Sequence, residues 1–327
     1  MKISFKRVAV AIAAFVVIFL IIRYVLPNST SQPPLETAET AEISSQARNN
    51  AQTNDASRGD DASLPVEPML AIRHITHDEF NHAIANPRSY EIDGFIMAGV
   101  VPHHITAATM ISGFFSQAAT FADYYDLVII LGPNHTGDLA NVVLSYRDWD
   151  IGEGVFTHKG FVSDLMEARY VNSAICHYRS EVDHSVSILI PFIYHYLPGV
   201  EVVSVLLNRS LGVGETLFLY RWITEWINQS DKNVLLVASI DFSHFLTPAQ
   251  AMAKDRITSE AIMNGDYWFI HGLNYHHLDS AAAMIIFMKY LEWLDIPPQI
   301  IDHTDASEFL GSGLDETTTY KIIIGTK

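Results

Sequence analysis

Apolar and polar positions follow two different patterns along residues 69–327. Short, continuous apolar runs are typical of strands buried on both faces of a sheet, and they occupy residues 95–101, 127–131, 142–145, 202–207, 234–238 and 320–325. Apolar residues at helical spacing predict helices over residues 107–120, 185–196, 215–227, 248–263 and 279–294. This alternation predicts an α/β fold, a single domain with a central, mostly parallel sheet flanked by helices on both faces.

The first 27 residues differ from this pattern. Residues 8–22 form an uninterrupted apolar run that follows Lys2, Lys6 and Arg7, and apolar residues continue past Arg23. If Arg23 reaches toward the interface, this length predicts one N-terminal transmembrane helix, with the N-terminus in the cytoplasm and the domain outside it. A cleaved signal peptide is the alternative. The uncleaved membrane anchor is preferred, because the run exceeds a signal core and no small-x-small site follows it directly.

Residues 28–68 are rich in Ser, Thr, Ala, Gln, Asn, Pro and Asp, and they contain few large apolar side chains. Such a segment buries too little surface to offset the entropy cost of ordering it. We therefore expect a flexible linker over residues 28–68, followed by one folded domain over residues 69–327.

Net charge excludes one class of partner. The chain has a net charge of −17, and residues 28–327 alone carry −21 because the four charged residues of the first 27 are all basic. Binding to nucleic acid requires Lys and Arg to neutralise phosphates, so we expect no nucleic-acid partner.

Histidines follow the ends of three predicted strands. His103 comes directly after the first run, His135 after the second and His244 after the run at residues 234–238, where Asp241 precedes it. In open α/β sheets the ligand site lies beyond the carboxyl ends of the strands, so these side chains are expected to share one cleft. Histidine is the commonest metal ligand, although a single His in a turn is more often a cap or a surface residue.

A fourth histidine, His184, lies just before the predicted helix over residues 185–196. His184 is expected to enter the same cleft as an acid, a base or a substrate-binding group. Its neighbours Asp183 and Ser185 are candidates for the N-cap of that helix.

Five segments in this order resemble the Memo family, which is called AmmeMemoRadiSam system protein B in bacteria and archaea. They are Pro102-His103, Leu-Gly-Pro-Asn-His at residues 131–135, the segment 149–165, Asp183-His184-Ser185 with Ile190-Pro191-Phe192, and Ser-Ile-Asp-Phe-Ser-His at residues 239–244. The resemblance covers residues 92–294. It implies a fold similar to the class III extradiol dioxygenases, which use non-haem Fe(II), and a metal bound by two histidines and a cysteine.

Carried over by position, the two histidines are His103 and His135, and the position of the cysteine holds Asp279. Two His and one carboxylate are typical of non-haem Fe(II) sites, so we expect a divalent metal, with Fe(II) first and Zn, Mn or Cu as alternatives. Asp279 also precedes a predicted helix, and a role as its N-cap competes with the role of ligand.

Further roles follow from the same resemblance. His184 and His244 are expected to handle protons, and Asp241 to orient a histidine. His276 and His277 are alternative ligands or surface residues.

The sequence thus predicts a Memo-like metalloprotein with non-haem iron redox or dioxygenase-type chemistry and a small-molecule or peptide ligand in the cleft. The alternatives are a non-enzymatic module that binds a peptide or sequesters metal, and a zinc hydrolase. The last of these lacks an H-E-x-x-H signature.

Overall fold

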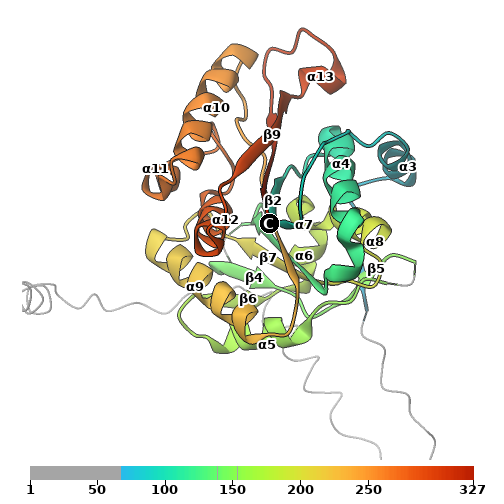
Figure 1. Cartoon of the computed structure of the whole chain (residues 1–327), viewed down its shortest axis with the longest axis vertical. Coiled ribbons are helices and arrows are strands. Elements are labelled where there is room, and N and C mark those ends of the chain that lie inside the picture. Colours follow the sequence, from blue (N-terminus) through green and yellow to red (C-terminus); the bar gives the residue numbers. More distant parts are fainter. Residues whose placement is uncertain (1–67, 138, 153) are drawn as a thin grey trace, which may run out of the picture. The chain divides into compact units, whose positions relative to one another are not determined.

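An eight-stranded sheet forms the centre of the computed structural model, which describes residues 68–137, 139–152 and 154–327 (Figure 1). The strand order is β6-β4-β7-β3-β8-β2-β10-β9. In this order the strands span Ser173–Ile175, Val142–Leu144, Glu201–Leu207, Leu127–Pro133, Val234–Ser239, Ile96–Val101, Thr319–Thr326 and Gln299–Asp305. A separate two-stranded parallel sheet pairs β1 (Leu70–Ala71) with β5 (Trp149–Asp150).

The sheet is mixed, so the prediction of a mostly parallel sheet is wrong. The pairs β6/β4, β7/β3, β3/β8 and β8/β2 are parallel, whereas β4/β7, β2/β10 and β10/β9 are antiparallel. Only the short segment 134–141 joins β3 to β4, and parallel strands need a crossover of roughly a dozen residues or more. The chain therefore reverses direction there. At the other side, β9 and β10 pair antiparallel across the segment 306–318.

Helices cover both faces of the sheet, as the apolar runs predicted. Along β3, Leu127, Ile129 and Leu131 belong to one hydrophobic core, and Val128 and Ile130 belong to the other. Side chains that alternate between two cores bury the strand on both faces, which explains why it is apolar throughout. The α/β character and the two helical layers are therefore confirmed.

Each core has its own set of helices, which lie on opposite sides of the sheet in Figure 1. The first core packs against α5 (Lys159–Glu167), α9 (Val213–Gln229) and α12 (Ala281–Leu294). The second packs against α4 (Ala108–Ala118), α7 (His184–Ser187) and α8 (Ile190–Tyr196). The other helices are α3 (His77–Ala85), α6 (His177–Val182), α10 (Pro248–Met263), α11 (Tyr267–His271), α13 (Ser307–Leu310), and the 3₁₀ helices η1 (Ile105–Ala107) and η2 (Ala119–Tyr124).

Two of the observed helical regions differ from the predicted helices. The predicted helix 185–196 is two helices, α7 and α8, and Pro191 lies in the first turn of α8, where its missing N–H removes no hydrogen bond. The predicted helix 279–294 begins at Ala281, and its N-cap is Ser280, whose side chain accepts a hydrogen bond from the Ala283 N–H. Asp279 is therefore not the cap, and the competing role of Asp279 is removed.

The prediction of an N-terminal transmembrane helix, with a single-pass membrane location, is also corrected. No helix in the part of the chain that the structure describes has the length and apolar character needed to cross a membrane. The segment on which the prediction rested, residues 1–27, lies outside the described residues, as do residues 28–67 of the predicted linker.

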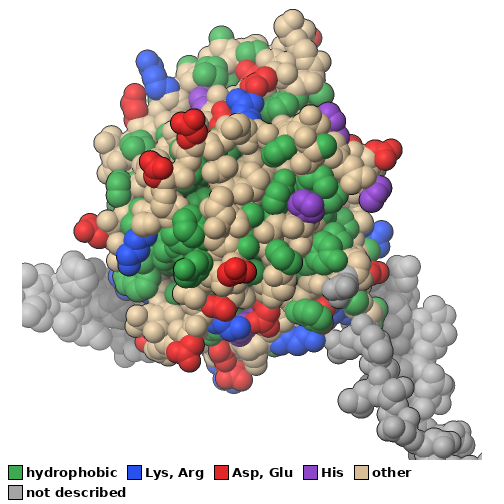
Figure 2. Space-filling model, turned by 45° about the vertical axis from the view of Figure 1, so that its right-hand side comes forward, with side chains coloured by type: hydrophobic (Ala, Val, Ile, Leu, Met, Phe, Trp, Pro, Cys, Tyr) green, Lys and Arg blue, Asp and Glu red, His purple; other side chains and the backbone are tan. Residues whose placement is uncertain are grey.

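Surface charge bears on the expected absence of a nucleic-acid partner. On the face shown in Figure 2, the Lys and Arg side chains are isolated among acidic, apolar and neutral groups. That face offers no basic patch for a phosphate backbone to follow. The exclusion of nucleic acid stays a prediction.

Candidate metal centre

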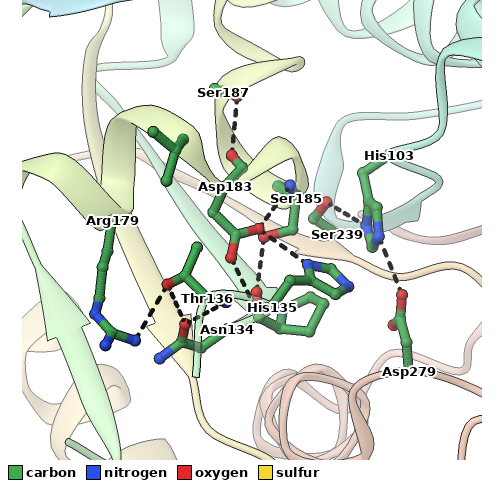
Figure 3. Close-up of polar contacts among 12 residues, drawn as sticks. His103, Asn134, His135, Thr136, Arg179, Asp183, Ser185, Ser187, Ser239 and Asp279 are labelled. Atoms are coloured by element: carbon green, nitrogen blue, oxygen red, sulfur yellow. Dashed lines mark hydrogen bonds and ion pairs between the residues drawn. The ribbon is translucent and has the colours of Figure 1, made fainter. Parts of the chain in front are cut away.

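Three neighbouring parallel strands, β3, β8 and β2, end at the same edge of the sheet. His135 follows β3, Asp241 follows β8 and His103 follows β2. His184 begins α7, and Asp279 lies just before α12. These two helices cover opposite faces of the sheet. The expected convergence at the carboxyl ends of the strands is therefore present in the fold, and Figure 3 shows several of these side chains facing one another.

His103 is the most enclosed of the histidines, with 1% of its surface exposed. Its Nδ1 lies 3.1 Å from Ser239 Oγ, and the Ser239 hydroxyl donates its own proton to the Ser185 carbonyl oxygen. Ser239 can then only accept from His103, so Nδ1 carries a proton. Nε2 faces the site, 3.0 Å from Asp279 Oδ2 and 3.8 Å from Asp241 Oδ2.

The carboxylates around His103 set its protonation. Burial alone lowers the pKa of the ring, but the negative charges of Asp241 and Asp279 outweigh burial and raise the pKa to about 9. Nε2 therefore holds a proton at neutral pH when no cation replaces it. A metal ion would take the place of that proton between His103 and Asp279.

His135 is oriented in the same way by a different partner. Its Nδ1 lies 3.0 Å from Asp183 Oδ1, and its backbone N–H donates to Asp183 Oδ2 at 2.7 Å (Figure 3). Asp183 is fully buried and also accepts from the Ser185 N–H, which makes it the N-cap of α7. Burial opposes ionisation of Asp183, but its hydrogen bonds with His135 prevail and lower its pKa to about 2. Asp183 is thus a fixed carboxylate that leaves His135 Nε2 free.

Asp183 was predicted only as a helix cap, and its contact with His135 was missed. Asp183 directly precedes His184 in the sequence, but no sequence pattern indicates that its side chain contacts His135 instead. A hydrogen bond from a ligand histidine to a carboxylate is a common second contact in metal sites.

His184 stacks on His135, with ring centroids 4.4 Å apart, and lies 5.1 Å from the His103 ring. Burial lowers the pKa of His184, and the charges of His103 and His135 lower it further, to about 3. The imidazole of His184 is therefore neutral over the whole physiological range. A neutral ring can bind a cation through its unprotonated nitrogen.

Asp279 carries a buried oxygen without a partner. Its Oδ2 accepts from the Asp241 N–H at 3.3 Å and faces His103, but Oδ1 has no hydrogen-bond partner among the described residues, and only 4% of the residue is exposed. Leaving a buried carboxylate oxygen unpaired costs about 1–3 kcal/mol or more. A cation at this position would remove that cost, so the residues present fit a metal ion.

Two groups of side chains have ligand atoms within 4.8 Å of one another. The first is His103, His135 and His184, and the second is His103, Asp241 and Asp279. Ligand atoms that share one ion at about 2.1 Å lie roughly 3 to 4.3 Å apart. In the second group, the distances of 3.0 Å and 3.8 Å from His103 Nε2 to the oxygens of Asp279 and Asp241 fall in this range. His103 belongs to both groups, whereas the predicted ligands His135 and Asp279 fall in different ones.

Other candidates lie apart from these groups. His244 is in neither group, and its backbone N–H donates to the Tyr275 carbonyl oxygen. His276 Nδ1 lies 3.1 Å from the His244 carbonyl oxygen, and His277 Nδ1 lies 3.0 Å from Thr258 Oγ1. Neither His276 nor His277 joins a group, and neither does Cys176, the single cysteine of the chain.

Comparison with known proteins agrees with the motifs. A family model described as "Memo-like protein" matches residues 83–315. A MEMO1 family protein of Pyrobaculum arsenaticum is 28% identical over 237 residues, which cover 70% of this chain and 83% of that protein. A MEMO1 family protein of Metallosphaera sedula is 28% identical over 179 residues, covering 51% of this chain and 60% of that protein.

Among solved structures, an uncharacterized protein of Escherichia coli K12, JW3007, aligns with a TM-score of 0.47 and 10% identity, over 68% of this chain and 99% of that chain. A likeness this distant carries no argument about fold or chemistry. The family match, in contrast, spans more than half of the chain. The resemblance drawn from the histidine motifs is therefore confirmed, and the chain belongs to the Memo-like family.

Proposed function

We propose that this protein holds one divalent metal ion through His103, His135 and Asp279 and uses it in redox chemistry. Binding of the ion requires His135 and Asp279 to move closer together, because their ligand atoms do not fall in one group within 4.8 Å in the structure. The observation that carries this proposal is the buried carboxylate of Asp279. Its Oδ2 lies 3.0 Å from Nε2 of His103, and its Oδ1 has no hydrogen-bond partner among the described residues. The His135 ring points toward the same space in Figure 3. Both imidazoles are held through Nδ1, which leaves Nε2 of each for a metal.

The donor set favours particular metals. Imidazole and carboxylate donors suit Fe(II), Mn and Zn, whereas Cu(I) prefers thiolates, and Cys176 belongs to neither ligand group. Iron is our first choice, because two His and one carboxylate leave coordination positions open for a substrate and O₂. The ion would supply a Lewis acid and a place where O₂ and substrate meet.

The residues around the ion have separate tasks. Asp183 fixes the direction of His135, and Asp241 holds His103 by accepting its backbone N–H at 3.0 Å. His184 is neutral and lies against both rings, so its proposed task is to hold a hydroxyl of a bound substrate by a hydrogen bond; with its pKa lowered to about 3 it is a weak base. His244, in the loop after β8, is a second proton-handling group at the margin of the site.

The test is metal analysis of the full chain after anaerobic loading with Fe(II), followed by O₂ uptake with a catechol. We expect about one iron per chain and O₂ consumption that depends on the substrate. An exposed histidine on α3, changed as His77→Ala, is the matched control and should keep both. A chain that binds no metal would contradict the proposal, and a chain that binds iron but consumes no O₂ would leave only a metal-binding module.

The third ligand is tested by substitution. Asp279→Cys places a soft thiolate in the site and should shift preference from Fe(II) toward Zn and Cu(I). His184→Ala should keep the metal but slow turnover. If His184→Ala loses the metal while Asp279→Ala keeps it, the ion is bound by the three histidines instead.

A further inference from the structure

A pocket of about 310 Å³ adjoins the candidate metal centre, and Asp279 is part of its wall. The loop after β7, residues 207–211, forms one side. The segment that leads from the end of α11 into the first turn of α12 forms the other. A ligand in this pocket would therefore lie next to Asp279, which we propose as a metal ligand. Pockets for small molecules begin at about 300 Å³, so this one suits a small molecule rather than a folded peptide.

The pocket wall is balanced in charge, unlike the acidic chain as a whole. The chain carries −17, yet Asp279 is the only acidic residue among the described residues that line the pocket, and Arg209 lines it too. Arg209 has no ion-pair partner within the described part of the chain. Its guanidinium lies over the Tyr275 ring, 5.6 Å from the centroid. A guanidinium held over a ring in this way keeps N–H groups that can donate to an anion.

The wall also has an apolar part. It includes Leu207, Leu211, Leu273 and Leu278, beside the polar residues Asn208, His271, Asn274 and Ser280. The leucines favour a ligand with an apolar body.

We propose that this pocket binds a small organic acid, whose carboxylate pairs with Arg209 and whose apolar body extends toward Asp279. A carboxylate matches the two-pronged edge of a guanidinium, and one arginine neutralises one negative charge. A phosphate dianion would leave excess negative charge beside Asp279. The position of the reacting end rests on the proposed metal site, but the recognition of the acid by Arg209 does not.

The experiment measures binding rather than turnover, on the full chain without metal and again after loading with Zn. The probes are two matched pairs: 3-phenylpropanoate with 3-phenylpropanamide, and benzoate with benzamide. Dissociation constants come from NMR titration. We expect each acid to bind about tenfold more tightly than its amide. Arg209→Met should abolish this preference, whereas Arg221→Met, on the exposed face of α9, should keep it.

Three results would overturn the proposal. They are equal binding of acid and amide, absence of binding by all four probes, and an acid preference that survives in Arg209→Met. Tighter binding of phenyl phosphate than of benzoate would overturn the assignment to carboxylates. Since the titration is first done without metal, failure of the metal site leaves its result intact, and loss of metal binding with an intact acid preference contradicts only the proposed function.

Discussion

Two clusters of buried histidine and aspartate lie in this domain, and they differ in how their carboxylates are satisfied. At the candidate metal centre, Asp279 faces His103 but keeps one oxygen without a partner among the described residues. In the second cluster, between α10 and the strands β9 and β10, both oxygens of Asp255 are used. Oδ1 accepts from the Ser243 hydroxyl at 2.7 Å, and Oδ2 lies 2.6 Å from His303 Nε2.

The second cluster also contains its own cation. Lys321 lies 3.8 Å from Asp255 with 1% of its side chain exposed, and its ammonium group also lies over the Phe242 ring. The charge of Asp255 is therefore balanced within the protein, and the cluster requires no ion. A buried His–Asp pair alone therefore does not indicate a metal site. The informative feature is a buried carboxylate that faces an imidazole and keeps one oxygen without a partner among the described residues.

The largest expected effect is the loss of metal from the first cluster. His103→Ala or His135→Ala should lower bound iron from about one per chain to less than about a tenth, because each change removes a ligand. The folded structure should remain, as judged by circular dichroism, and His77→Ala serves as control. Unchanged metal content in both variants would place the ion elsewhere.

Substitution of Asp255 and Asp279 tests whether the two carboxylates differ in their contribution to stability. Asp255→Asn removes the charge from a balanced buried cluster and leaves Lys321 uncompensated, which should cost about 3–5 kcal/mol of unfolding free energy. Asp279→Asn should cost the metal-free protein clearly less, because Asp241 still faces His103. Urea unfolding of both metal-free variants measures the difference. Equal losses would mean that both carboxylates serve only the fold.

Asp183→Asn should have an intermediate effect on the metal centre. Its side chain can still cap α7, but it no longer offers a carboxylate to His135 Nδ1, so metal affinity should fall by about 10–100-fold. Competition with a chelator measures the affinity. Asp164→Asn on the distant helix α5 is the control. An unchanged affinity would show that Asp183 acts only as a helix cap.

The smallest expected effect is a pH dependence from the second cluster. Burial lowers the pKa of Lys321 from 10.5 to about 8, although the charge of Asp255 opposes this shift. Between these values the unfolded chain binds the lysine proton and the folded chain does not, so this group makes stability rise with pH above 8. The penalty of burying the charged form is fully present below pH 8.

Lys321→Met should remove that rise, which we expect to amount to roughly 1–2 kcal/mol between pH 8 and pH 9.5. The measurement is the difference in unfolding free energy between wild type and variant across this range. Since other groups titrate equally in both proteins, the difference isolates Lys321. Parallel pH profiles would show that Lys321 is uncharged, or fully solvated, in the folded protein.

The sequence predicted those parts of the fold that depend on burial and missed those that depend on pairing. Continuous apolar runs identified β2, β3, β7 and β8, because strands covered on both faces must be apolar. Such runs also predicted β4 and β10 as strands, but they carry no information on direction, so the antiparallel pairing of these two strands was not foreseen. The edge strand β9 was missed because its residues, Gln299–Asp305, are polar or only partly buried.

For the site, the sequence predicted which side chains lie at the strand ends but not which residues contact them. The strand ends placed His103, His135 and Asp241 at one edge of the sheet, because parallel strands end together. The partners Ser239 and Asp183, in contrast, depend on contacts across more than 40 residues of sequence. Whether Asp279 or Ser280 caps α12 could not be decided, since either residue type serves as a cap and only backbone geometry separates them.

The central claim is that His103, His135 and Asp279 share one ion. The most direct measurement is a crystal structure of the chain loaded with Fe(II) without oxygen, with anomalous differences recorded at the iron edge. We predict one peak about 2.0–2.3 Å from Nε2 of both histidines and from a carboxylate oxygen of Asp279. A peak bound by His103, His135 and His184 without Asp279, or no peak at this edge of the sheet, would contradict the account.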